Sequence, residues 1–137
     1  LMQKNLKQYQ AVQNSGYNNP LGKLVFRFKN KEDIYLHDTP DQHLFKKNNR
    51  ALSHGCIRVQ NAEKLAQLLL TAQNQDDELK NLKQAIKNNT QKQFNLPKKI
   101  PVNISYLTCL IVDEMLVQYP DIYQLDQNLI EKINSNH

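Results

Sequence analysis

The hydrophobic pattern of this sequence changes its period at Val59, and this change constrains the fold more than any other feature. Before Val59, residues 24–28 and 34–37 are short apolar segments rich in strand-forming residues, with a charged turn between them. After Val59, leucines recur at helical spacing in two segments, the first from Asn61 and the second over about residues 76–87. A hairpin followed by helices predicts an α+β domain with mostly antiparallel strands.

The rest of the chain is predicted from the same two periods and from end signals. Asn61 is expected to cap the first helix with its side chain, and Glu63 to stabilise its first turn. Residues 41–50 are polar apart from Leu44 and Phe45, which predicts an exposed loop with a helical turn anchored by these two side chains. The other predicted elements are strands at 9–13, 102–112 and 116–119, a turn at 113–114 and a helix at about 125–133.

The length and charge of the chain limit its function. Its 137 residues make one domain or part of one. The net charge of +5 comes from scattered lysines without an arginine–aromatic stripe, which argues against nucleic acid and favours an anionic neighbour. No apolar run approaches the roughly 20 residues of a transmembrane span, and residues 1–10 do not read as a signal peptide. An export signal, if the protein has one, is expected to be missing from this sequence.

Residues 53–58, Ser-His-Gly-Cys-Ile-Arg, bring together groups suited to nucleophilic catalysis. Cys56 becomes a good nucleophile as a thiolate, which a nearby cation, base or dipole favours. Gly55 carries no side chain, so a substrate carbonyl can approach the backbone amides closely. Arg58 supplies a fixed positive charge that can hold a carboxylate, or it braces the loop by binding backbone carbonyls.

A second signal lies upstream, where the apolar residues 34–36 lead into His37. A histidine at the end of a strand is well placed to act as a base, because the strand fixes it and the following loop leaves the site open. Asp38 can orient the imidazole through its carbonyl or its carboxylate, or it can form an Asx turn before Pro40. Residues 38–52 must fold back for His37 and Cys56 to meet.

Several alternatives remain open at this point. Cys109 lies in the predicted strand 102–112 and is expected to be a buried core residue rather than a disulfide partner of Cys56. A metal site made of His37, His54 and Cys56 is disfavoured, because two ligands spaced as His-x-Cys without a second pair do not suit zinc. His43, in the polar loop, is expected to be a solvated surface residue.

The spacing of the two signals resembles the active-site signature of the L,D-transpeptidases, bacterial cell-wall enzymes with a YkuD-type catalytic domain. The resemblance is carried by Tyr-Leu-His-Asp-Thr-Pro at 35–40 and Ala-Leu-Ser-His-Gly-Cys-Ile-Arg-Val at 51–59, and it extends from about Tyr9 to about Tyr123. It is greatest to the large periplasmic branch of the family. The resemblance implies a β-sandwich-like domain, of which residues 1–137 would be the C-terminal portion without the N-terminal strands.

The resemblance also implies a reaction. Cys56 would attack a tetrapeptide stem of peptidoglycan and release D-alanine, and a diaminopimelate amine of a second stem, or water, would resolve the thioester. His37 would be the acid–base catalyst, and His54 would shape the site and stabilise the thiolate. Gly55 and Ser53 would bind the oxyanion or the substrate together with Arg58.

Other implications concern ligands and location. The family needs no cofactor or metal, is acylated by carbapenem β-lactams and acts in the periplasm or cell envelope. A catalytically silent peptidoglycan-binding fragment and an L,D-carboxypeptidase are the alternative functions.

Overall fold

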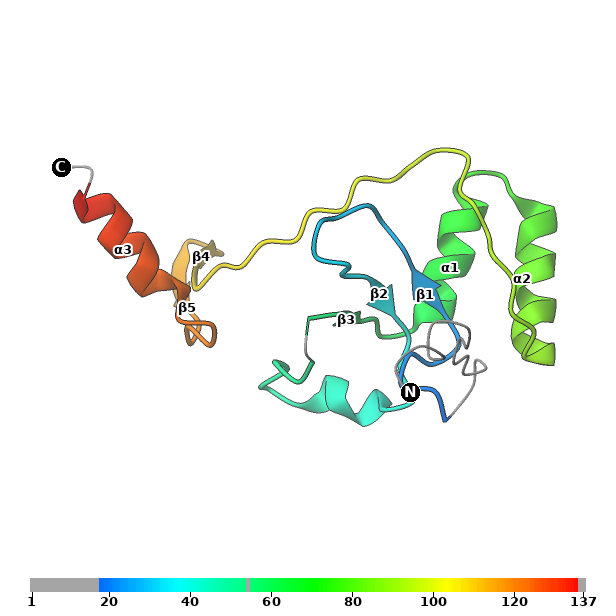
Figure 1. Ribbon diagram of the computed structural model, residues 1–137, viewed down its shortest axis with the longest axis horizontal. Coiled ribbons are helices and arrows are strands. Elements are labelled where there is room, and N and C mark those ends of the chain that lie inside the picture. The colour runs from blue at the N-terminus through cyan, green and yellow to red at the C-terminus, as the bar shows by residue number, and fades with distance from the viewer. Residues whose placement is uncertain (1–17, 54, 136–137) are drawn as a thin grey trace, which may run out of the picture. The chain divides into compact units, whose positions relative to one another are not determined.

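The computed structural model describes residues 18–53 and 55–135 (Figure 1). The chain divides into two compact units, residues 1–100 and 101–137, and each is described by itself. The predicted strand at 9–13 lies outside the described residues. No helix among the described residues is both long and apolar enough to cross a membrane.

A three-stranded sheet organises the first unit. Its strands are β1 (Val25–Phe26), β2 (Leu36–His37) and β3 (Ile57–Arg58), in the spatial order β1-β2-β3. β1 and β2 are antiparallel and pair Val25 with His37, which confirms the predicted hairpin. β2 and β3 are parallel, so the connection between them must return to the same end of the sheet. A 3-10 helix in this connection, η2 (Gln42–Lys46), is the predicted helical turn.

The segment that contains β1 separates the two faces of the unit. Leu24 and Phe26 are half-buried and pack against a core of Ala66, Leu70 and Leu82, whereas residues 23, 25, 27 and 29 are exposed. Because side chains alternate along a strand, this core lies on one face of the segment. The opposite face, to which Val25 belongs, is the face of the sheet that also carries His37.

Two helices supply that core, and their predicted positions are confirmed. They are α1 (Ala62–Thr71) and α2 (Asp76–Asn88), which pack against each other (Figure 1). Glu63 lies in the first turn of α1 as predicted, but the predicted side-chain cap is wrong. Asn61 adopts a left-handed conformation with φ of 56° and makes no capping bond through its side chain.

The core predicts a large effect for Leu82→Ala. Leu82, on α2, is 2% exposed and packs with Ala66 and Leu70 of α1, so its truncation leaves a cavity. We expect a loss of about 2–5 kcal/mol in the free energy of unfolding, measured by urea denaturation. Leu68→Ala on α1 is the matched control, because Leu68 is 63% exposed and should lose well under half as much. Equal losses in the two variants would contradict this core.

The second unit is a hairpin followed by a helix. β4 (Cys109–Val112) pairs antiparallel with β5 (Met115–Gln118) through the predicted turn, where Asp113 and Glu114 both have positive φ, at 48° and 64°. This two-residue turn with positive φ at both positions matches the right-handed twist of a hairpin. The predicted C-terminal helix is α3 (Leu125–Ser135), and the Asp121 carboxylate accepts from the first amides of this helix at 3.1 and 2.8 Å.

The prediction of a long buried strand at 102–112 is wrong in its length and its burial. Only residues 109–112 form a strand, and Cys109 is exposed. Among the described residues of this unit none is fully buried, because one hairpin and one helix supply no second apolar layer. Three helices with two small sheets confirm the predicted α+β class.

Candidate active site

The parallel pairing of β2 with β3 brings the two predicted signals together. His37 is level with Arg58 in the register, and Tyr35 is therefore level with Cys56, two residues earlier on each strand. Backbone amides hold this register, since Ile57 donates to the carbonyl of Tyr35 at 3.0 Å and Val59 donates to that of His37 at 2.8 Å. Paired residues of neighbouring strands point to the same face. The thiol and the imidazole thus occupy one face of the sheet, opposite the face to which Phe26 contributes.

His37 is buried, with 5% of its surface exposed, and the backbone fixes its tautomer. Its Nδ1 donates to the carbonyl oxygen of Asp38 at 2.5 Å. A carbonyl only accepts, so the proton must be on Nδ1, and in the neutral ring Nε2 carries the lone pair. This is the form of imidazole that can take a proton from a thiol.

The carboxylate of Asp38 points to other partners. Its Oδ2 accepts from the amide of Lys23 at 3.0 Å, and its Oδ1 lies 3.5 Å from Nε2 of Gln42. Gly22 makes this packing possible, because a Cβ there would lie 2.4 Å from Oδ2 and the residue has a φ of +62°. Asp38 has two groups that could orient the imidazole. Its carbonyl accepts the hydrogen bond from His37, whereas its carboxylate accepts from the amide of Lys23 in the preceding turn.

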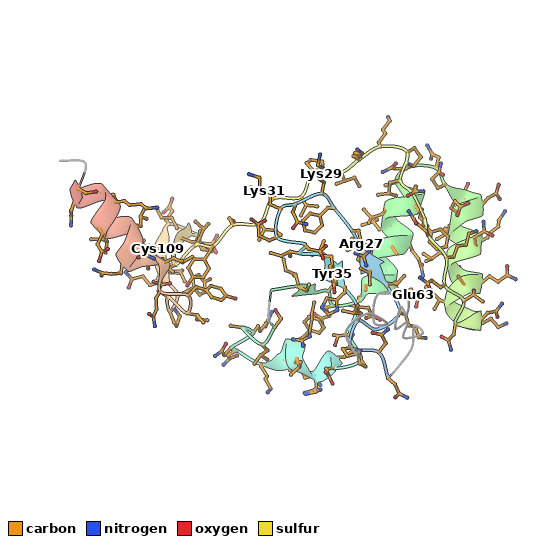
Figure 2. The ribbon with its side chains drawn as sticks, in the orientation of Figure 1. Arg27, Lys29, Lys31, Tyr35, Glu63 and Cys109 are labelled. Atoms are coloured by element: carbon orange, nitrogen blue, oxygen red, sulfur yellow. The ribbon has the colours of Figure 1, made fainter. Side chains whose placement is uncertain are left out.

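Cys56 is half-buried, and the parallel register sets it level with Tyr35. The interaction of the Tyr35 hydroxyl with Cys56 is the main cause that raises the pKa of Tyr35, with burial of the phenol second, while the guanidinium of Arg27 acts in the opposite direction. The Tyr35 ring also meets the His37 ring edge to face, with centroids 6.0 Å apart. The guanidinium of Arg27 lies over the Tyr35 ring, 5.2 Å from the ring centroid, and Figure 2 shows the two residues next to each other.

The loop before Cys56 is held by Arg58 and shaped by Gly55. Nη1 of Arg58 donates to the carbonyl of Leu52 at 3.0 Å, while its Nε is buried without a partner among the described residues. Gly55 has a φ of +145°, which residues with a side chain rarely adopt, and its amide donates to Oγ of Ser53 at 3.4 Å. A Cβ at Gly55 would meet no atom within 4 Å, so the space beside the loop is open.

Three further predictions concern His54, a metal site and His43. His54 lies outside the described residues, so its role stays a prediction. Among the residues that the structure describes, no group of three or more histidine, cysteine or acidic side chains is arranged to hold a metal ion. His43 is exposed on η2, as expected for a solvated surface residue.

The hollow beside Asp38 is separate from the thiol. It has a volume of about 380 Å³ and lies between the turn that contains Gly22, the Asp38 segment and the start of α1 at Glu63. Neither Cys56 nor His37 lines it.

Tyr35 belongs to the candidate site, but the sequence pattern alone does not predict a role for it. It lies in the motif at 35–40, in which His37 is the strand residue with a predicted role. The signal was available in the spacing, because a residue two positions before a catalytic candidate on a strand shares its face.

Comparisons with known proteins identify the family of this chain. The family model of the YkuD L,D-transpeptidase catalytic domain matches residues 2–104. A protein of Haemophilus influenzae, provisionally named an L,D-transpeptidase, is 36% identical over 121 residues. That similarity covers 88% of this chain and 24% of the relative, so the chain spans about a quarter of the relative's length. The chain belongs to the YkuD family of L,D-transpeptidase catalytic domains.

Proposed function

We propose that this chain is the C-terminal portion of an L,D-transpeptidase catalytic domain that cross-links peptidoglycan, with Cys56 as its nucleophile. One observation supports this assignment most. The parallel β2–β3 register puts Cys56 on the same face as His37, a buried imidazole whose Nδ1 proton is held by the Asp38 carbonyl. A thiol beside a base that is itself oriented by a third group is the arrangement that nucleophilic catalysis needs.

In the acylation step, His37 Nε2 takes the thiol proton and Sγ of Cys56 attacks the carbonyl of the third residue of a tetrapeptide stem, in the amide that joins it to D-alanine. The tetrahedral intermediate collapses by breaking the carbon–nitrogen bond, and His37 returns its proton to the departing amine of D-alanine. A thioester on Cys56 is left. The diaminopimelate amine of a second stem then attacks the thioester, gives its proton through His37 to the sulfur, and forms the cross-link.

The oxyanion of these intermediates is assigned to the amides of Gly55 and Cys56. The Gly55 amide now makes a 3.4 Å contact with Ser53, at the long end for a hydrogen bond, so a charged oxygen can replace Ser53 at little cost. The open space beside Gly55 is where the substrate carbonyl would enter. Backbone donors aimed at a developing negative charge are often the largest contribution to catalysis.

Arg58 and His54 complete the proposed site. The bond from Arg58 to the Leu52 carbonyl supports the role of a loop brace. Binding of a stem carboxylate is the second role, and it is supported by the buried Nε that has no partner among the described residues. For His54 we retain the role of shaping the site and stabilising the thiolate.

The proposed partners and location follow from the family. The substrates are peptidoglycan stem peptides, the acyl acceptor is an amine or, in an L,D-carboxypeptidase, water, and the protein acts in the periplasm or cell envelope. A silent peptidoglycan-binding role is the alternative, and it predicts no covalent intermediate.

A carbapenem tests the proposal directly. The thiolate opens the β-lactam by adding to its carbonyl, so no group leaves and the protein gains the full mass of the drug. We expect one adduct on the peptide that contains Cys56, measured by intact-mass and peptide mass spectrometry of the full-length protein. Cys109→Ala should keep the adduct, since Cys109 is an exposed thiol of the other unit. An unmodified protein, or an adduct on Cys109, would contradict the assignment.

A further inference from the structure

We propose that Tyr35 is a further catalytic residue, whose hydroxyl donates a hydrogen bond to the sulfur of Cys56 and stabilises it as the thiolate. This inference rests on the proposed role of Cys56 as the nucleophile. It differs from the role of His37, because Tyr35 neither takes nor carries the proton of the reaction, and it would act on the thiolate together with His54.

The backbone places Tyr35 beside the thiol. Its carbonyl accepts from the Ile57 amide at 3.0 Å, in the ladder that sets Tyr35 level with Cys56. The residue before it is also held, because the Asn30 side chain donates to the Ile34 carbonyl at 2.6 Å and accepts from the Ile34 amide at 2.9 Å. The Tyr35 main chain is thus fixed from both sides.

Two further contacts hold the phenol ring. The His37 ring meets it edge to face at 6.0 Å and 63°, and the guanidinium of Arg27 lies 5.2 Å from its centroid. Figure 2 shows Arg27, the residue after β1, next to Tyr35. With the ring held between an imidazole and a cation, and level with Cys56 in the register, we expect the hydroxyl to reach the sulfur.

The electrostatics make the hydroxyl a donor. At neutral pH a phenol is protonated, and its raised pKa, caused first by the interaction with Cys56 and then by burial, keeps it so. Two charges act on the pKa of Tyr35: Arg27, which follows β1, lowers it, and Asp33, in the loop before β2, raises it. His37 and Arg58 are level with each other on β2 and β3, on the face of the sheet that carries Tyr35 and Cys56.

Tyr35→Phe removes the hydroxyl and keeps the ring, so it isolates the bond. A hydrogen bond to a charged partner is among the stronger ones, and its loss should raise the midpoint pH of Cys56 alkylation by iodoacetamide by about one unit. Acylation by a carbapenem at pH 7 should slow about tenfold for the same reason. Both rates are measured in the full-length protein carrying Cys109→Ala, so that Cys56 is the thiol being followed. A thermal melt checks that the fold is kept.

Tyr119→Phe is the matched control, because Tyr119 lies in the other unit and is 51% exposed. It should leave the midpoint and the acylation rate unchanged. If Tyr35→Phe also leaves both unchanged while Tyr35→Leu lowers the melting temperature, Tyr35 is a packing residue and the inference is wrong. If Tyr35→Phe moves the alkylation midpoint but no variant is acylated, the inference stands and the proposed transpeptidase function fails.

Discussion

Replacing Cys56 by alanine is expected to abolish the acyl-enzyme and lower turnover by a factor on the order of 10³ or more, the scale seen when a nucleophile is removed. The reason is that a thioester needs a thiol, and the other cysteine of this sequence, Cys109, belongs to the other unit. Cys56 is only half-buried and is absent from the hydrophobic core, so the fold should be nearly unchanged. Release of D-alanine from a tetrapeptide substrate and intact-mass spectra measure the two effects.

Cys109→Ala is the matched thiol deletion for this experiment. Cys109 is exposed, so its loss should change neither the chemistry nor the stability by much. Turnover retained in Cys56→Ala, or lost in Cys109→Ala, would mean that the nucleophile has been assigned to the wrong thiol. Loss of both thioester and folded structure in Cys56→Ala would show that Cys56 has a packing role instead.

Local pattern was sufficient to predict the hairpin and the helices around the site, but not β3, which follows Cys56 directly. The hairpin between β1 and β2 follows from two strand-like segments around a charged turn, and α2 follows from its leucine spacing. Burial in the second unit could not be predicted in this way. The apolar segment around Cys109 has the composition of a core strand, yet burial requires a second apolar layer, which the described residues of this unit do not supply.

The details of the site depend on contacts between distant residues. The sequence could not decide between the carbonyl and the carboxylate of Asp38, because both belong to one residue. The choice is made by the turn at Gly22 and Lys23, which takes the carboxylate. The placement of Tyr35 level with Cys56 likewise depends on the parallel register of β2 and β3, which neither strand specifies alone.

The second large effect is expected from His37→Ala, which should slow acylation by a factor on the order of 10² or more, the usual size of an acid–base contribution. The imidazole is buried and its Nδ1 proton is held by the Asp38 carbonyl, so Nε2 is the nitrogen available to the thiol. Because His37 comes from a different strand from Cys56, it can reach both the sulfur and the leaving amine. Single-turnover acylation by a carbapenem measures the effect without the later steps.

His43→Ala is the matched control for His37→Ala, since His43 is an exposed imidazole on η2 and its loss should leave acylation unchanged. His54→Ala separates the two histidines of the signature. It should slow acylation less than His37→Ala does, and mainly by raising the pH at which the thiol reacts with iodoacetamide. If His54→Ala stops acylation while His37→Ala leaves both acylation and thiol reactivity intact, the two roles are reversed. A base held by the loop of the nucleophile, and not by the neighbouring strand, would then carry the proton.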